Sequence, residues 1–238
     1  TQIIASLSVV ATLSAIAATP IHHYDFNGAT VTDTVGAAHG TLLNGASVAG
    51  GMLQLDGVND YVQFAQMLVP TSGPFSVAFF ARENSPTTDP MEMISQGSTY
   101  GPGFYVGKYS GTMRIGDSWQ STGVNMPSAG VFHHYAVTMD GATTRLYIDG
   151  LQVASTGAIS IANTGDFTRL GRQFYYPLEP IFGPEMFHGD MDELWIYTGA
   201  LTATEVAGLA VIPEPSSLVI VALGFIALTA KCPAGRKH

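Results

Sequence analysis

The chain has 238 residues, of which 46% are hydrophobic and only 11% are charged, and this length is enough to bury one sizeable core. Nine Lys and Arg residues oppose 18 Asp and Glu residues, and three of the nine bases fall in the last eight residues, so the body is acidic. A nucleic-acid partner is excluded because phosphate binding needs a basic surface, and the single cysteine, Cys232, excludes a disulfide within the chain.

The first segment has the composition of a secretory signal peptide. Residues 2–18 are small and aliphatic, and Ala15-Ile16-Ala17 resembles an A-x-A cleavage site. The initiator Met and the positively charged n-region are missing, so we expect residues 1–19 to be the later part of such a signal. The alternative is an unusually apolar first strand or helix of the domain itself.

Residues 20–210 read as one domain of short strands separated by turns. Strand candidates lie at residues 21–26, 53–64 with a loop in the middle, 75–82, 91–95, 103–108, 112–117, 132–139, 145–148, from 151 onward, 167–172 and 187–197. Strands at such regular, short spacing predict a two-sheet antiparallel sandwich.

Two short motifs in the second half of the domain predict a hairpin turn and the start of a helix. Asp149-Gly150 is a two-residue connection whose glycine tolerates positive φ, so the strands on either side are predicted to form a tight hairpin with a type I′ turn. Thr202 followed by Glu205 three residues later is a capping box, which predicts one short helix over residues 201–209.

The exact residue order of several segments points to a family more specifically than their periodicity does. FHHYAVTMDG and RLYIDGLQVA of the central hairpins, LQLDGVNDYVQF from Leu53, and the closing FHGDMDELWIY from Phe187 carry the signal. They resemble laminin G-like jelly rolls of the concanavalin A-like lectin and glucanase superfamily, in which a tryptophan often stands where this chain has Phe132. The resemblance implies an all-β jelly roll over residues 20–210.

Carboxylates on the closing strand raise the question of catalysis. Glucanases of the same superfamily place acid and nucleophile at alternate strand positions, facing the substrate together. Alternation predicts that Asp190 and Asp192 share one face while Glu193 points to the other, and the E-x-D-x-x-E order of those enzymes is absent. We therefore expect no catalytic residue, and a degenerate glycoside hydrolase is a remote alternative.

The resemblance also implies a candidate structural calcium site. In laminin G-like folds a calcium ion often ties the N-terminal loop to the closing strand, and Asn27, Asp33 and Asp192 stand at matching positions. Oxygen ligands of this kind suit Ca²⁺. The alternative is an ordinary network of hydrogen bonds around the same residues.

Aromatic residues in or beside predicted loops are the candidate sugar contacts. Tyr175 and Tyr176 lie in a predicted surface loop rich in proline and aromatic residues, and Trp119 follows a short strand candidate. Flat rings stack on the apolar faces of sugars while polar neighbours bind hydroxyls. Core packing is the alternative for each of these rings.

The last 28 residues have the layout of a sorting signal. Pro213-Glu214-Pro215 precedes an apolar segment over about residues 216–230, which predicts a hydrophobic helix, and a short basic tail with Cys232 follows. Residues 211–238 resemble the PEP-CTERM signal of Gram-negative and planctomycete-type bacteria. The resemblance implies transient membrane insertion and cleavage near Pro213 to Pro215 by a membrane exosortase.

Together these patterns predict an exported, exosortase-processed binding or adhesion module at the outer surface or in the extracellular matrix of a Gram-negative-type bacterium. The expected ligand is a glycan or a matrix component. The alternative is a structural component of the matrix or envelope that binds no ligand. The cofactor expected is at most one structural Ca²⁺.

Overall fold

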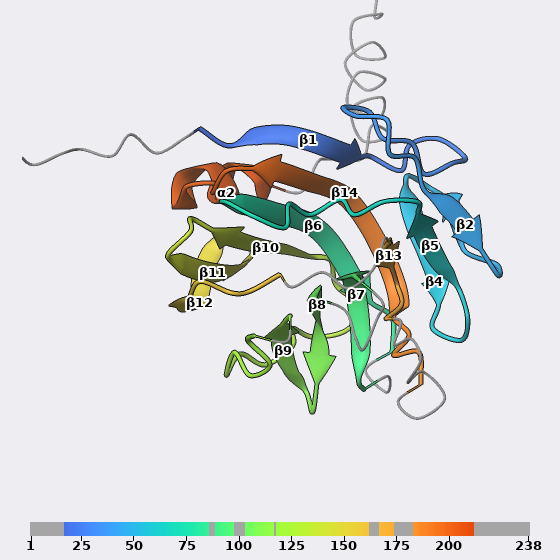
Figure 1. The fold of residues 1–238 in the computed structure, drawn as a ribbon. Coiled ribbons are helices and arrows are strands. Elements are labelled where there is room, and N and C mark those ends of the chain that lie inside the picture. The colour runs from blue at the N-terminus through green and yellow to red at the C-terminus, as the bar shows by residue number, and fades with distance from the viewer. Residues whose placement is uncertain are drawn as a thin grey trace, which may run out of the picture.

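The computed structural model describes residues 17–85, 89–97, 103–116, 118–161, 167–173 and 183–211. It is a sandwich of two antiparallel sheets with one hydrophobic core between them (Figure 1). The prediction of an all-β jelly-roll sandwich with one short helix is confirmed. The proposed hydrophobic helix over residues 216–230 lies outside the described residues, and no helix within them is both long and apolar enough to cross a membrane.

The larger sheet, here called the large sheet, has eight strands. Its strands, in spatial order, are β12 (Leu151–Gly157), β11 (Thr143–Ile148), β10 (His133–Met139), β6 (Phe75–Glu83), β14 (His188–Thr198), β4 (Met52–Asp56) and β3 (Ser47–Ala49), and β1 (Thr19–Tyr24) also pairs with β14. β14 therefore lies in the middle of the sheet, where one half of it pairs with β4 and the other half with β1.

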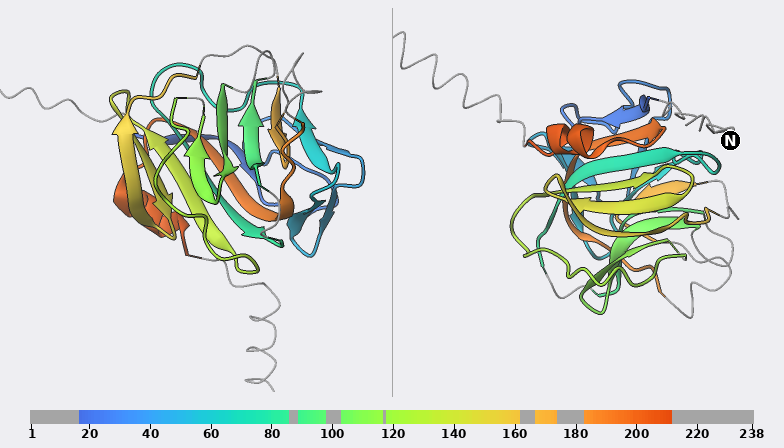
Figure 2. Two further views of the ribbon diagram at one scale, coloured as in Figure 1. Left: turned by 90° about the horizontal axis from the view of Figure 1, so that it is seen from below. Right: turned by 90° about the vertical axis from the view of Figure 1, so that its left-hand side faces the viewer.

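The second sheet, here called the small sheet, has six strands. In spatial order they are β2 (Thr41–Leu43), β5 (Tyr61–Phe64), β13 (Thr168–Leu170), β7 (Met91–Gln96), β8 (Phe104–Tyr109) and β9 (Thr112–Ile115). β2 and β3 contain three residues each, and both escape the sequence prediction because so short a run shows no periodicity. The two layers are seen edge-on in Figure 2.

Alternation along β6 shows how the core forms. Phe75, Val77 and Phe79 belong to the main core cluster between the sheets, while Ala78 packs in a second cluster on the other side of the large sheet. Because successive strand residues point to opposite faces, β6 contributes to both clusters. We call the side of the large sheet that faces away from the small sheet its outer face.

The helix α2 (Ala203–Leu209) covers one end of this outer face. Thr202 and Glu205 form the predicted capping box, and Val206 packs with Tyr147 and Tyr197 in the second cluster. The described residues contain no second helix that could cover the remainder of the outer face, toward β4 and β3. That end carries the polar side chains of the candidate site.

Candidate functional site

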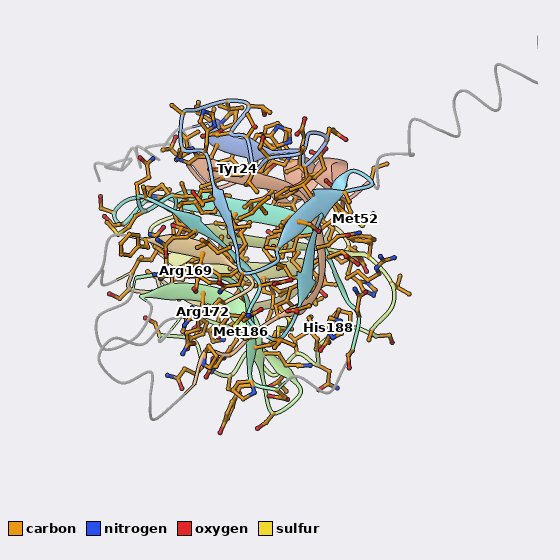
Figure 3. All side chains as sticks on the ribbon, turned by 90° about the vertical axis from the view of Figure 1, so that its right-hand side faces the viewer. Tyr24, Met52, Arg169, Arg172, Met186 and His188 are labelled. Atoms are coloured by element: carbon orange, nitrogen blue, oxygen red, sulfur yellow. The ribbon has the colours of Figure 1, made fainter. Side chains whose placement is uncertain are left out.

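An open, polar pocket of about 430 Å³ lies on the outer face near the β3 edge of the large sheet. Its lining comes from β3, β4, β6 and β14, and from the residues that follow β4 and β6: Ser47, Gln54, Leu55, Asp56, Asp60, Arg82, Asn84 and Asp190. Met52 and His188, labelled in Figure 3, mark this region, because Met52 Sδ lies 4.0 Å from Arg82 and His188 pairs in register with Asp56. The β3–β4 hairpin and the strands β6 and β14, from three separate parts of the chain, thus meet at one polar concavity.

Asp190 holds the central donor groups of the pocket in place. Its Oδ2 accepts hydrogen bonds from Arg82 Nε at 3.0 Å, from Arg82 Nη2 at 2.6 Å and from Asn84 Nδ2 at 3.0 Å. The Arg82 guanidinium also lies 4.8 Å from the centre of the Phe132 ring, a cation–π contact. Arg82 and Asn84 are therefore pre-positioned, which lowers the entropy cost of binding a ligand.

Two further carboxylates come from the turn between β4 and β5. Asp56 Oδ1 accepts hydrogen bonds from the backbone N–H groups of Val58 and Asn59, and these bonds hold the pKa of Asp56 below its usual range. Asp60 is only 6% exposed; its Oδ2 accepts from the Asp56 backbone, and its Oδ1 has no hydrogen-bond partner among the residues that the structure describes. Burial raises the pKa of Asp60.

The chemistry available in this pocket is hydrogen bonding with both donors and acceptors. Guanidinium, amide, hydroxyl and carboxylate groups line a shallow surface, and the Phe132 ring covers one side of Arg82. Sugars present closely spaced hydroxyls that both donate and accept hydrogen bonds, so such a lining suits them.

A second polar group on the outer face surrounds the Trp195 side chain. The His23 imidazole stacks on the Trp195 indole, and Glu193 Oε2 bonds both to His23 Nε2, at 2.8 Å, and to Trp195 Nε1, at 3.2 Å. A β-bulge between Asp192 and Trp195, with Glu193 at φ 50°, breaks the alternation. The prediction that Glu193 points away from this face was wrong for that reason.

Asp33, predicted as a calcium ligand, organises the loop after β1. Its carboxylate makes hydrogen bonds with five groups: His22 Nδ1 and the backbone N–H groups of His23, Val35, Gly36 and Ala38. Both oxygens are thereby engaged, which is the arrangement of a loop-organising aspartate and leaves little capacity for a cation.

The other two predicted ligands lie apart from this network. Asn27 is exposed, with its backbone N–H bonded to Asp25, and Asp192 is half-buried with its Oδ1 accepting from the Glu193 backbone. No group of three or more His, Cys, Asp or Glu side chains arranged to hold a metal ion occurs in the described ranges. Bound calcium remains a prediction.

The predicted aromatic contacts have different positions. Trp119 is only 8% exposed and packs in the main core, which agrees with the core-packing alternative and leaves little of the ring for a sugar. Tyr175 and Tyr176 lie outside the described residues, as do the processing residues Pro213, Glu214 and Pro215. The glycan role of the two tyrosines therefore remains a prediction.

The sequence prediction missed Arg82, Asn84, Gln54 and the role of Asp190. One signal was available: Arg82 is one of only six bases before the C-terminal tail, and it lies near the end of a mostly apolar strand at an outward position. Asp56 and Asp60 were visible within LQLDGVNDYV, but nothing in the sequence placed them beside Arg82.

Comparison with known families agrees with this fold. The family model of the concanavalin A-like lectin/glucanases superfamily matches residues 56–207. The chain therefore belongs to the concanavalin A-like lectin and glucanase superfamily. A sequence comparison with curated proteins gives no match.

Solved structures with the same fold include carbohydrate-active and toxin domains. Domain 4 of AbnA, a GH43 extracellular arabinanase from Geobacillus stearothermophilus solved with arabinotriose, is 23% identical with a TM-score of 0.64, over 81% of this chain and 98% of that one. The binding domain of botulinum neurotoxin serotype D/C is 12% identical, with a TM-score of 0.61, over 80% of this chain and 51% of its own. A botulinum neurotoxin DC binding domain in complex with SialylT is 14% identical, with a TM-score of 0.60, over 80% of this chain and 50% of its own. The chain thus spans about half of the neurotoxin domains, and at these identities the likeness shows the fold.

Proposed function

We propose that this protein is a non-catalytic glycan-binding module and that the polar pocket on the large sheet is its sugar site. The observation that carries the proposal is the fixed Arg82–Asp190–Asn84 group, which offers oriented donors and acceptors at an open surface. The solved relatives include a domain bound to arabinotriose and a binding domain in complex with SialylT, which supports a sugar as ligand.

A glycan array probed with the purified protein tests this function. We expect binding to at least one neutral oligosaccharide, and weak affinity at a single site because the pocket is shallow. An array without hits contradicts the proposal and favours the alternative of a structural component that binds no ligand.

A matched pair of variants then assigns the site. Gln54 lines the pocket and is exposed, whereas Gln120 is exposed in the turn region after β9 and does not line it. Gln54→Ala is expected to weaken binding about fivefold, equivalent to one hydrogen bond of about 1 kcal/mol, and Gln120→Ala to leave it unchanged. Equal affinities for both variants and the unmodified protein would place the sugar elsewhere.

The proposal includes no hydrolysis of the bound sugar. Asp190 Oδ2 already accepts three hydrogen bonds, from Arg82 and Asn84. Asp192 lies on the same face, and its Oδ1 accepts a hydrogen bond from the Glu193 backbone. Incubation with each array hit, followed by an assay for new reducing ends, is expected to show none. Sugar cleavage that disappears in Asp192→Asn would instead identify a glycoside hydrolase.

We further propose that the domain acts outside the cytoplasm. The support is the signal-peptide composition of residues 1–19 and the Pro-Glu-Pro box, apolar segment and basic tail of residues 211–238. An exosortase would insert and cleave the tail near Pro213 to Pro215. Mass spectrometry of the mature protein from the cell surface is expected to find a C-terminus in this region, and a mature chain ending at His238 would contradict the processing.

A further inference from the structure

The edge strand β12 leaves one side of its backbone unpaired. β12 is the outermost strand of the large sheet and pairs only with β11. Across the described part of the chain, no other backbone segment hydrogen-bonds to residues 151–157. Over the seven residues of the strand, alternate N–H and C=O groups on this side therefore have no backbone partner within the described ranges.

The remaining sheet edges of the described structure are protected. β2 and β3 are three residues long, and β9 is covered through isolated bridges from Thr112 to Asn125 and from Ile115 to Trp119. β1 contains Pro20 and an irregular register, and its His23 carbonyl accepts a hydrogen bond from the Thr34 backbone. Short length, proline, bulges and covering loops are the usual ways in which proteins prevent edge pairing.

β12 has neither the short length nor the proline of those edges, although its pairing with β11 is irregular between Leu146 and Tyr147. Its sequence, LQVASTG, contains no charged residue and no proline, and Leu151 and Val153 are 72% and 42% exposed. Val211, just beyond the helix α2 that contacts β12, is also 72% exposed. An uncharged, apolar open edge on a chain of net charge −9 favours strand pairing there.

We propose that β12 pairs with β12 of a second copy of this chain, in antiparallel orientation about a twofold axis. Such a pair is self-complementary, because each strand offers the same groups that it receives. It would join the two large sheets into one continuous sheet of 16 strands, since each sheet contributes eight.

Charge favours the antiparallel orientation of the two copies over the parallel one. The start of β12 follows Asp149, whereas near its end Ser155 pairs in register with Arg145. An antiparallel pair centred on Ala154 separates the two Asp149 residues by about 33 Å, several Debye lengths at physiological ionic strength. A parallel pair would place the two acidic starts side by side.

The size of the contact predicts its strength. A seven-residue strand pair with three flanking apolar side chains is smaller than the roughly 1,000 Å² typical of stable interfaces, so we expect a dissociation constant in the micromolar range. The strand β14, which carries Asp190, is the fifth strand from this edge, so the two polar pockets would lie about nine strand spacings, or about 43 Å, apart along the joined sheet.

Analytical ultracentrifugation of the full chain between about 1 and 200 µM tests the dimer, with a reductant present so that Cys232 cannot link two chains. We expect a concentration-dependent shift from 25.1 kDa to twice that mass. Val153→Lys and Leu151→Lys should shift the dissociation constant upward at least tenfold. Val58→Lys is the matched control, because Val58 is as exposed as Leu151 but lies far from β12 in the sheet order.

Two results would overturn the dimer proposal. A monomer at 200 µM overturns the proposal, and so does a dimer that Val58→Lys disrupts as strongly as Val153→Lys, because the contact would then lie elsewhere. Thermal melts of each variant must match the unmodified protein. If Val153→Lys does not fold, Leu151→Lys at the exposed start of the strand decides.

Discussion

The His23 imidazole and the Trp195 indole stack with ring centres 3.5 Å apart and planes 14° from parallel. The contact joins the first strand of the domain to its last, and both His23 nitrogens also have partners: Thr34 Oγ1 at 2.7 Å and Glu193 Oε2 at 2.8 Å. One side chain thus connects β1, the loop after it and the bulge in β14.

Replacement of His23 by Ala is expected to destabilise the domain. The variant loses the ring stack and leaves Glu193 with one partner fewer, for a total cost of about 1–3 kcal/mol. Urea unfolding at pH 7 measures the difference. Thr34→Ala serves as a control that removes the two hydrogen bonds of the Thr34 hydroxyl to His23 and keeps the stack. A loss as large as that of His23→Ala would show that the stack contributes nothing.

Asp33 should make the domain sensitive to acid. Burial opposes ionisation of this carboxyl, but hydrogen bonds from the Gly36 backbone, His22 and the His23 and Ala38 backbones outweigh it and lower its pKa to about 2. A lowered folded-state pKa gives stability that is present above the unfolded value near 4 and is lost as the pH falls toward 2. Asp33→Asn is expected to cost about 2–4 kcal/mol at pH 7 and to flatten the dependence of the unfolding free energy on pH between 4 and 2. An unchanged slope in the variant would assign the acid sensitivity to other groups.

Asp192 should act in the opposite direction. Burial is the main reason that its pKa is raised to about 7, and the charges of Glu193 and Asp25 add to the effect. A raised pKa gives stability that is fully present below the unfolded value near 4 and is lost as the pH rises through about 7. Asp192→Asn is therefore expected to be more stable than the unmodified protein at pH 8, by about 1–2 kcal/mol after allowance for solvent screening. Thermal melts at pH 5 and pH 8 measure the effect, and equal differences at both values would contradict it.

A buried charge group on the small sheet offers a double-mutant test. Arg114 pairs with both Glu92 and Glu185 and lies over the Tyr105 ring. Burial raises the pKa of Glu92 well above its usual range. Arg114→Ala leaves buried carboxyls uncompensated, so we expect a loss of about 3–5 kcal/mol.

The second substitution shows whether the charge is the cause. Because Glu92→Gln removes the carboxyl that Arg114 neutralises, the double variant should be more stable than Arg114→Ala alone by at least about 1 kcal/mol. Chemical denaturation of the four proteins completes the cycle. Additive effects would contradict a direct interaction between the two side chains.

Local features of the fold were predictable from sequence. Asp149 and Gly150 adopt φ values of 50° and 78°, as the predicted type I′ turn requires, and Thr202 and Glu205 form both bonds of the predicted capping box. These signals succeed because each depends on residues adjacent in the chain, whose conformational preferences are intrinsic.

The candidate site was not predictable by the same means. Its pocket joins Ser47, Gln54, Arg82 and Asp190, residues that come together only through the order of strands in the large sheet. The orientation of Glu193 was missed because a one-residue bulge reverses the alternation on which the prediction depended.

The central position of β14 also governs when the domain can fold. β14 bonds to β6 on one side and to β4 and β1 on the other, so these strands have no common partner until residues 188–198 have been synthesised. The hydrogen bond between His23 and Glu193 likewise joins residues 170 positions apart in the chain. Contacts between residues so far apart in sequence form slowly and late in folding. The large sheet of this protein consequently cannot be completed until nearly all of the domain has been made.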